Sequence, residues 1–501
     1  MAPYNASLIR GGKSRMSKKI IGRTSELQIL KEIEKSKDAE FVAVYGRRRV
    51  GKTFLIREFF SKKNIYMEAT GIKDASLSKQ LKNFTSAIST TFFKGTPLKT
   101  PSSWEEVFSL LTKELQSLPK TKKITLFIDE LPWLCTKRSR LIQALDYYWN
   151  AHWSKQSNLI LIVCGSAASW MLENLIYAKG GLYNRLTKRL LLEPFNLKET
   201  KEFLESRSIK LNQKQVLDLY MAIGGIPFYL KEVKKGKSTA QIIDDLCFKK
   251  TGLLHTEFLN LFKALFDQSE TNIKIIREIV KAGNMLSRDQ IMKAIGKTSG
   301  GTLNKRLNEL EASSFIHSFI PYEKQKRGRF YRITDEYTLF YVKWIEPLLK
   351  SGVYATNISH WKKIYPTPSR LIWAGYAFES VCFKHLEQII HALDLDNISF
   401  RAGTWRFIPS KSSKTQGAQI DLLFDRDDNA ITICEIKYSD SLFTIDKAYS
   451  KILLQKMDVF EEQQKKSKEM FLAMITIKGV KPNVWSEDLV DLEVTLEDLY
   501  L

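Results

Sequence analysis

The chain has 501 residues, of which 44% are hydrophobic and 27% are charged. This composition is typical of a globular protein, and one hydrophobic core cannot organise such a length, so we expect about three or four domains. No apolar run of about 18 residues occurs, which argues against a transmembrane helix and against a membrane partner. Residues 1–17 are basic but lack the apolar segment of a secretory signal, so we interpret them as a flexible tail.

The charge balance favours a polyanionic partner. Lys and Arg number 78 against 55 Asp and Glu, which gives a net charge of +23. Such an excess attracts polyanions, and nucleic acid is the commonest of them, so we expect DNA as a partner. A generally basic proteome would produce the same number, so the charge alone leaves that alternative open.

The cysteines exclude two classes of small-domain architecture. They are scattered singly and form no CxxC pair, which rules out a zinc ribbon and a disulfide framework. Free cysteines are usually buried and inert, and their persistence fits a reducing cytoplasm, where we place the protein. The five are Cys135, Cys164, Cys247, Cys382 and Cys434.

Residues 18–196 alternate between strand and helix patterns. Apolar runs at 41–45, 124–128 and 159–163 predict buried strands, and residues 54–60 follow the first with helical spacing. Continuous apolar strands separated by helices are typical of a parallel sheet covered on both faces. We therefore predict a multidomain α/β protein that begins with such a sheet.

Residues 46–53 carry the pattern GxxxxGK[ST] between the first predicted strand and the helix after it. Glycines in this pattern let backbone N–H groups surround phosphates, the lysine neutralises them, and the hydroxyl ligates Mg²⁺. The pattern predicts a P-loop that binds ATP with Mg²⁺. Its residues are Gly46, Arg47, Arg48, Arg49, Val50, Gly51, Lys52 and Thr53.

An acidic pair ends the second predicted strand. Asp129 and Glu130 follow the apolar run at 124–128, at the edge of the sheet where ligands of parallel α/β sheets bind. We expect Asp129 to hold the Mg²⁺ shell and Glu130 to act as the general base toward the attacking water. A solvated strand end before Pro132 is the alternative, but two acids after a wholly apolar strand favour a use for their charge.

Two further polar candidates come later in this region. Ser166 follows the third strand and could orient the water, although a simple helix N-cap explains it nearly as well. Arg185 is a candidate arginine finger, as is Arg189, and a surface or ion-paired arginine is the alternative for each.

Five segments in this order resemble the archaeal-type ATPases, a branch near the STAND and AAA+ groups. They are residues 21–27, 44–53, 127–130, 164–166 and 224–230. The resemblance implies a P-loop ATPase fold with a helical lid, which we expect at 197–268, where amphipathic helices replace the strands. It also implies that Gly22 and Arg23 lie near the adenine. The usual charged pair after Gly-Arg is Thr24-Ser25 here, a minor departure.

Residues 269–345 have the pattern of a winged helix-turn-helix, with helical segments followed by a strand pair. Its recognition helix would be residues 301–312, which carry Lys305 and Arg306. The tip of its wing would contact the DNA backbone without reading sequence. A rigid lid or a docking surface for another protein is the alternative. The wing residues are Lys324, Lys326, Arg327 and Arg329.

Residues 346–501 pair carboxylates with a lysine on a predicted hairpin. Asp421 opens the strand at 420–424, and Glu435 and Lys437 share one face of the strand at 431–437. Two carboxylates and a lysine can hold Mg²⁺ and orient a nucleophilic water. This arrangement resembles the PD-(D/E)xK nucleases, which implies a restriction-endonuclease-like α/β domain with Glu379 as a further metal ligand. An ordinary surface hairpin, or a domain that binds DNA without cutting it, is the alternative.

Three functions are compatible with the sequence. The first is an ATP-hydrolysing enzyme that acts on DNA and carries a Mg²⁺-dependent nuclease domain. The second is an ATP-controlled signalling or regulatory switch whose C-terminal domains bind DNA or protein without cleavage. The third is a DNA-binding regulator with a slow ATPase. The charge and the basic wing favour the first and third, the four C-terminal site residues favour the first, and a homo-oligomer is compatible with each.

Overall fold

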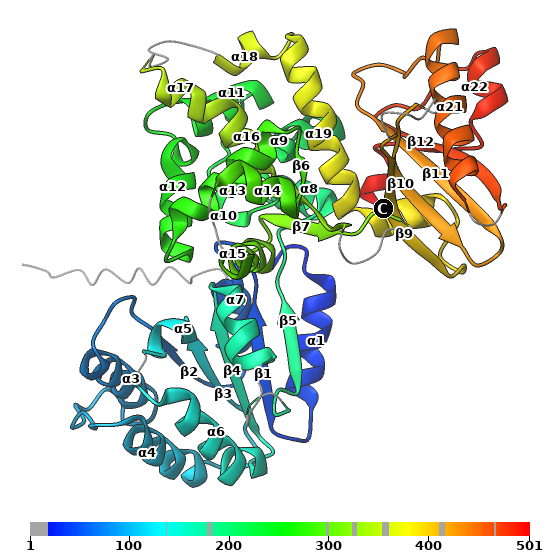
Figure 1. The fold of residues 1–501 in the computed structure, drawn as a ribbon. Coiled ribbons are helices and arrows are strands. Elements are labelled where there is room, and N and C mark those ends of the chain that lie inside the picture. Colours follow the sequence, from blue (N-terminus) through cyan, green and yellow to red (C-terminus); the bar gives the residue numbers. More distant parts are fainter. Residues whose placement is uncertain are drawn as a thin grey trace, which may run out of the picture.

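The computed structural model describes residues 19–136, 138–177, 182, 184–296, 300–322, 328–352, 360–409, 416–464 and 467–501. Within them lie a lower α/β body, a helical body above it, and a second sheet to its side (Figure 1). No helix in the described part of the chain combines the length and apolar character needed to cross a bilayer.

The lower body is a five-stranded sheet in the order β2-β3-β4-β1-β5, with every neighbouring pair parallel. The predicted runs became β1, β3 and β4, whereas the sequence analysis missed β2 and β5, two strands at the sheet edges whose side chains are partly exposed. The strands are β1 (Glu40–Tyr45), β2 (Ile65–Thr70), β3 (Ile124–Asp129), β4 (Leu159–Gly165) and β5 (Lys188–Leu191).

Alternate residues of each strand enter different cores, because successive side chains point to opposite faces. Val42, Val44 and Ile160 pack on the face that also receives α1 and α2. Phe41 and Ala43 pack on the opposite face, beneath the other helices. The sheet is therefore covered on both sides, as predicted. The helices are α1 (Thr24–Lys35), α2 (Lys52–Phe60), α3 (Leu77–Phe92), α4 (Trp104–Ser117), α5 (Leu131–Leu134), α6 (Leu141–Ala151) and α7 (Ala168–Met171).

Residues 197–268 form helices only, and all of them lie in the described part of the chain. Capping boxes at Asn196 and Asn212 begin α8 and α9, since each side chain accepts a backbone N–H of the first turn. Gly224, with a φ of 67°, ends α9. The helices are α8 (Leu197–Ser206), α9 (Gln213–Ile223), α10 (Pro227–Leu230), α11 (Thr239–Ile243) and α12 (Leu253–Leu265), with a π-helical turn at Asp244–Phe248.

A small sheet with three helices follows. The strands are antiparallel in the order β6-β8-β7, and β7 and β8 form the hairpin that the sequence predicted. Helix α15 contacts α7 of the lower body, so this unit sits directly on the α/β body (Figure 1). The elements are α13 (Ser269–Lys281), β6 (Met285–Ser287), α14 (Arg288–Ile295), α15 (Gly300–Ala312), β7 (Ile316–Phe319) and β8 (Phe330–Ile333).

The helices after β8 join the helical body. Trp361 packs against Phe248, Phe340 and Trp373, so the predicted boundary at residue 346 falls inside one continuous core. Helix α19 contacts both α9 and the second sheet, and thereby connects the two bodies. The helices are α16 (Glu336–Phe340), α17 (Glu346–Lys350), α18 (His360–Ile364), α19 (Pro368–Lys384) and α20 (Leu386–Ala392), with a π-helical turn at Tyr341–Ile345.

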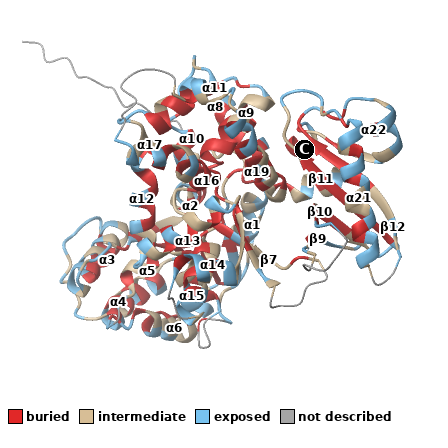
Figure 2. Cartoon of the chain, turned by 45° about the horizontal axis from the view of Figure 1, so that its top comes forward, coloured by how far each residue is buried: buried red, intermediate tan, exposed pale blue. Residues whose placement is uncertain are grey.

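The second sheet has the order β13-β12-β11-β10-β9, in which β9, β10 and β11 are antiparallel and β11, β12 and β13 are parallel. Its central strands β10, β11 and β12 are mostly buried (Figure 2), and α19 contacts β11 while α21 contacts β10. The elements are β9 (Phe400–Phe407), β10 (Ala418–Arg426), β11 (Ala430–Lys437), α21 (Lys447–Gln463), β12 (Glu469–Thr476), α22 (Val484–Leu489) and β13 (Leu492–Val494).

Candidate functional site

The loop between β1 and α2 requires glycine at two points. Gly46 has a φ of 132°, and a Cβ there would lie 2.3 Å from the carbonyl oxygen of Leu192. Gly51 has a φ of 98° and faces open space, since an added Cβ would meet no atom within 4 Å. Left-handed backbone and close approach explain why the pattern needs glycine here. The loop therefore has the backbone geometry that phosphate binding requires.

Lys52 begins α2 with its ammonium group folded back over the loop. Its Nζ donates to the carbonyl oxygens of Gly46 and Arg47 at 2.8 Å each. Burial of the side chain lowers the pKa of Lys52, which reflects a charge held in a desolvated setting. A phosphate at the same loop would be a better partner for that charge than two neutral carbonyl groups.

Thr53 and Asp129 meet beside the loop. The Thr53 hydroxyl donates to Asp129 Oδ2 at 2.7 Å, and Asp129 is buried at the end of β3. A hydroxyl and a carboxylate, both oxygen ligands, suit Mg²⁺, which usually takes one or two carboxylates plus substrate phosphates. The residues present therefore fit Mg²⁺ bound to ATP.

Glu130 and Ser166 form a second polar pair, at the carboxyl ends of β3 and β4. Glu130 has a φ of 49°, and its Oε2 accepts the Ser166 hydroxyl at 2.9 Å and the Ser166 backbone N–H at 3.2 Å. Strand β4, which ends just before Ser166, lies between β1 and β3, so Ser166 emerges between the phosphate loop and the acidic pair. The N-cap alternative for Ser166 is not what the structure shows, because Ala167 precedes α7 and no side chain caps it.

Gly22 and Arg23 connect the loop to the helical body. Arg23 donates through Nη2 to the carbonyl oxygen of Val50 at 3.2 Å, and its backbone N–H donates to Glu199 Oε1 at 2.7 Å. An added Cβ at Gly22 would lie 2.6 Å from the same carboxylate oxygen. This segment therefore touches both the phosphate loop and α8.

The arginine side chains of the loop contact residues outside it. Arg47 is buried and pairs with Asp335 through both guanidinium nitrogens, one of them at 3.0 Å. Arg49 Nη1 lies 2.6 Å from Glu257 Oε1. Arg48 lies 5.9 Å from the ring of Trp133. The prediction that Arg47 and Arg49 belong to the nucleotide-binding loop stays a prediction, and in this structure carboxylates of the helical body bind their side chains.

The structure separates the predicted DNA-binding residues into three groups. Lys305 and Arg329 are exposed. Arg306 is buried and pairs with Glu309, one turn further along α15, at 2.9 Å. The prediction that Arg306 contacts DNA is therefore corrected, because Glu309 neutralises its charge and the side chain does not reach the surface. Lys324, Lys326 and Arg327 lie outside the described residues. Arg185 is exposed, in the segment that precedes β5.

The hairpin of β10 and β11 brings the C-terminal candidates together. Glu435 is 2% exposed and accepts from Lys437 Nζ at 2.8 Å, from Lys456 Nζ at 2.7 Å and from the Tyr449 hydroxyl at 2.7 Å. Burial opposes ionisation, but the two ammonium groups together lower the pKa of Glu435. Sequence reasoning missed Lys456 and Tyr449, which are seven positions apart on α21 and so share one helix face.

Asp421 lies beside this cluster. Its Oδ2 accepts the backbone N–H of Ile436 at 3.2 Å. Burial, together with the charges of Glu435 and Glu379, raises the pKa of Asp421 to about 7. Carboxylates that crowd one site in this way are characteristic of functional centres.

Glu379 is near enough to act on Asp421 but binds elsewhere. Its Oε1 accepts from Arg332 Nη2 of β8 at 2.9 Å. Among the described residues, no group of three or more His, Cys, Asp and Glu side chains is arranged to hold a metal ion. The joint metal site of Glu379, Asp421 and Glu435 therefore stays a prediction: here Arg332 pairs with Glu379, and Lys437 and Lys456 pair with Glu435.

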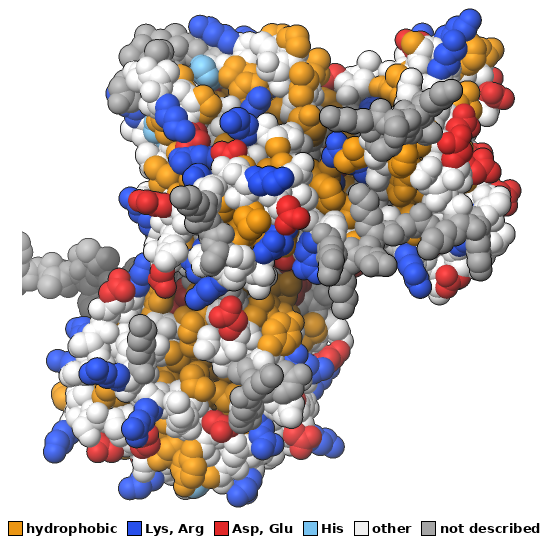
Figure 3. All heavy atoms as spheres, in the orientation of Figure 1, with side chains coloured by type: hydrophobic (Ala, Val, Ile, Leu, Met, Phe, Trp, Pro, Cys, Tyr) orange, Lys and Arg blue, Asp and Glu red, His pale blue; other side chains and the backbone are white. Residues whose placement is uncertain are grey.

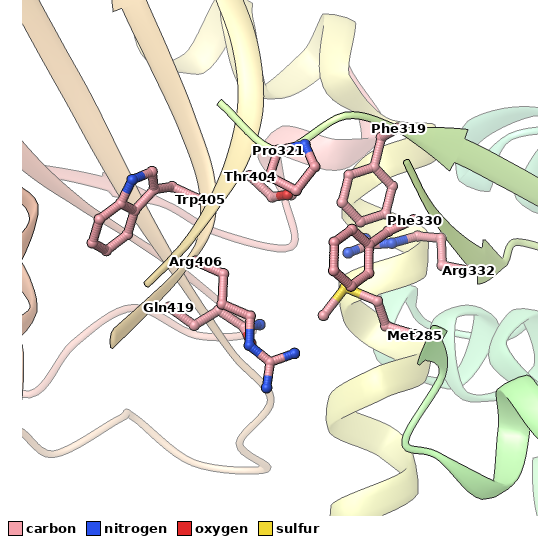
Figure 4. Close-up of a pocket in the computed structure, with 9 residues that line it drawn as sticks. All are labelled: Met285, Phe319, Pro321, Phe330, Arg332, Thr404, Trp405, Arg406 and Gln419. Carbon is pink, nitrogen blue, oxygen red and sulfur yellow. The ribbon is translucent and has the colours of Figure 1, made fainter. Parts of the chain in front are cut away.

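Arg332 also borders a hollow between the small sheet and the second sheet (Figure 4). In this hollow, Arg406 of β9 and Gln419 of β10 face the aromatic side chains of β7 and β8. Tyr322 spans the two sheets, since its N–H donates to the Thr404 carbonyl oxygen and its hydroxyl to Asp425. The hollow is lined by Met285, Phe319, Pro321, Phe330, Arg332, Thr404, Trp405, Arg406 and Gln419.

A comparison with known families matches the part of the chain that contains the first of these two sites. Residues 20–233 match a family described as an ATPase domain predominantly from Archaea. An uncharacterized protein of Methanocaldococcus jannaschii is 27% identical over 429 residues, which cover 84% of this chain and 88% of that protein.

Solved structures with a similar fold include the Walker-type ATPase of Pyrococcus abyssi, at 19% identity and a TM-score of 0.47, covering 65% of this chain and 96% of that one. The ORC2 protein of Aeropyrum pernix, at 13% identity and a TM-score of 0.41, covers 68% of this chain and 97% of its own. The family match and the loop geometry together identify residues 20–233 as an archaeal-type P-loop ATPase domain.

Proposed function

We propose that this chain hydrolyses ATP with Mg²⁺ and uses that reaction to act on DNA through its C-terminal half. The observation that carries the ATPase proposal is the convergence of Lys52, the Thr53–Asp129 pair and Glu130 around one loop. Lys52 would neutralise the phosphates, and Thr53 with Asp129 would hold Mg²⁺. Glu130 would accept the proton of the attacking water, with Ser166 fixing the direction of its carboxylate.

We extend the proposal to the second sheet as a PD-(D/E)xK-like domain. Asp421, Glu435 and Lys437 lie on neighbouring strands, and burial together with the charges of Glu435 and Glu379 raises the pKa of Asp421, which supports this proposal. A Mg²⁺ ion bound by such carboxylates would stabilise charge on a scissile phosphate. Lys437 and Lys456 would then hold the developing negative charge or the water.

We propose that the unit from α13 to β8 is a winged helix and that it contacts DNA. Exposed Lys305 and Arg329 supply cations on α15 and beside β8. Figure 3 shows Lys and Arg side chains over this face of the molecule, with Asp and Glu among them, and the net charge of +23 supports contact with a polyanion. Arg406 at the hollow between the two sheets adds a cation on the side of the carboxylate cluster.

The test is an ATPase assay and a plasmid-cutting assay on one preparation. ATP turnover should rise when duplex DNA is added and should vanish in Lys52→Ala. Cutting in Mg²⁺ or Mn²⁺ should be lost in Asp421→Ala while ATP turnover persists. If Asp421→Ala and Lys437→Ala cut as well as the wild-type chain, the assignment of the second site is wrong.

A regulatory switch is the second candidate, and one observation favours it. Arg47 of the phosphate loop pairs with Asp335, so the nucleotide site contacts the C-terminal half directly, and no DNA contact is needed to connect them. A switch would show ATP binding but no stimulation of turnover by DNA and no cutting with either metal ion.

A further inference from the structure

The five-residue segment 332–336 runs from the end of β8 into the first residue of α16 and makes three ion pairs that reach both proposed sites. Arg332 pairs with Glu379, Asp335 with Arg47, and Glu336 with Lys384 at 2.7 Å. Glu379 and Lys384 both lie on α19, the helix that contacts the second sheet. One short segment therefore holds the phosphate loop at one end and the C-terminal carboxylates at the other.

The pair at the nucleotide end is fully buried. The side chains of Arg47 and Asp335 are 1% and 0% exposed, and the guanidinium lies 4.9 Å from the centroid of the Phe315 ring. Asp335 also caps α16, because its Oδ2 accepts the backbone N–H of Thr338 at 3.0 Å. Any displacement of Arg47 would leave a buried carboxylate without its partner, so the start of α16 would have to shift.

The pair at the other end is less enclosed, because the Glu379 side chain is 20% exposed. Arg332 is 5% exposed, and its guanidinium lies 4.0 Å from the centroid of the Phe383 ring on α19. One of its nitrogens, Nη1, is buried and makes no hydrogen bond. Arg332 thus binds α19 through Glu379 and Phe383. It also neutralises Glu379, the third carboxylate of the predicted site around Asp421.

We propose that this segment is a latch through which nucleotide controls the C-terminal site. Arginine binds phosphate and carboxylate in the same bidentate manner, so phosphates in the loop compete with Asp335 for Arg47. Release of Asp335 moves the segment, separates Arg332 from Glu379 and makes Glu379 available to the acidic cluster. This inference rests on the proposed function of that cluster, but its central test does not.

Coupling between two sites is reciprocal, so breaking the latch must change nucleotide affinity. The measurement is the Kd of a non-hydrolysable ATP analogue with Mg²⁺, by calorimetry on the full chain. Asp335→Asn should tighten binding by about fivefold or more, because Arg47 is freed. Glu379→Gln, a change in the distant half of the chain, should tighten binding in the same direction. A merely structural role would weaken binding or leave it unchanged.

Asp428→Asn is the matched control, because it removes an exposed partner of Arg426 in the same sheet and should leave the Kd unchanged. If Asp335→Asn does not fold, Glu379→Gln decides alone. Equal Kd values for wild type and Glu379→Gln overturn the latch.

Plasmid cutting by Arg332→Gln separates the latch from the nuclease proposal. Cutting without nucleotide supports both, since the variant releases Glu379 directly. Tighter nucleotide binding with no cutting by any variant supports the latch and rejects the nuclease. Cutting by the wild-type chain with unchanged Kd values rejects the latch alone.

Discussion

Thr53 and Asp129 lie 76 positions apart, and a 2.7 Å hydrogen bond from the hydroxyl to Oδ2 joins them. The bond connects the first turn of α2 with the end of β3, next to Lys52 and Glu130. It places a hydroxyl and a carboxylate where a divalent ion would meet the phosphates held by the loop. The pair therefore predicts a metal dependence that can be measured.

Asp129→Asn should reduce the affinity for Mg²⁺ in ATP hydrolysis by roughly 10- to 100-fold, the usual range for a lost oxygen partner of a metal. The measurement is ATP turnover against Mg²⁺ concentration, with the midpoint as the readout. Asp74→Asn, an exposed residue with a left-handed backbone that Asn tolerates, is the control and should not move the midpoint. An unchanged midpoint in Asp129→Asn would exclude Asp129 from the metal site.

Glu130→Gln should lower kcat by roughly 10²- to 10⁴-fold, because the general base is removed, while analogue binding stays within about twofold. Ser166→Ala should have a smaller effect, since Glu130 keeps the Ser166 backbone N–H at 3.2 Å and loses only the hydroxyl at 2.9 Å. Single-turnover kinetics on both variants checks the order of the two effects. A larger loss in Ser166→Ala would reverse the assigned roles.

Asp421→Asn should raise the melting temperature at pH 8 and leave it nearly unchanged at pH 4. The pKa of Asp421 is raised to about 7 from the ordinary 3.8, so the folded chain holds this proton more strongly than the unfolded chain. The free energy of unfolding of the wild-type chain therefore falls as pH rises from about 4 to 7. The variant does not lose this stability, because the amide that replaces the carboxyl group stays neutral throughout. Melting curves of both proteins across this interval measure the difference. A variant that is less stable at pH 8 would contradict the burial of charge at this site.

His385 should make the helical body sensitive to acid. Its Nε2 accepts the backbone N–H of Leu197 at 3.0 Å, and its Nδ1 lies 2.8 Å from the carbonyl oxygen of Val381. Burial lowers the pKa of His385 from 6.5 to about 4, so the unfolded chain takes up this proton first. The stabilisation is present above pH 6.5 and is lost as pH falls toward 4, by roughly 3 kcal/mol in full.

The comparison that isolates this effect is His385→Gln, whose amide oxygen can accept the same N–H at every pH. The wild-type chain should be the more stable at pH 7.5, and its advantage should shrink steadily toward pH 4.5. A difference in melting temperature that stays constant over this interval would contradict the prediction.

Much of the nucleotide site was predictable because its signals are local. An apolar run followed by glycines and a lysine specifies a strand, a tight loop and a helix, and the structure has β1 ending at Tyr45 and α2 beginning at Lys52. Asp129 and Glu130 were predictable for the same reason. The edge strand β2 was missed because it is half exposed, and a partly buried edge strand lacks the continuous apolar run of a central one.

The ion-pair partners of the charged residues could not be predicted from the sequence. The pattern after Tyr45 predicts that Arg47 belongs to the nucleotide-binding loop, but it does not predict that the Arg47 side chain pairs with a carboxylate 288 positions away. Glu379 lies on α19 and its charge acts on Asp421, but its partner Arg332 comes from the small sheet. Pairs of this kind depend on which helices pack together, and a charge pattern carries no information about that.

The sequence by itself thus determined the ATPase loop, its acidic pair and the β10–β11 hairpin, because backbone sterics and alternating side chains act over a few residues. Only the tertiary structure decided that Arg47 binds Asp335, that Arg332 binds Glu379, and that Lys456 joins Glu435. A buried charge must find an opposite charge wherever packing brings one, and packing joins segments that are far apart in the chain.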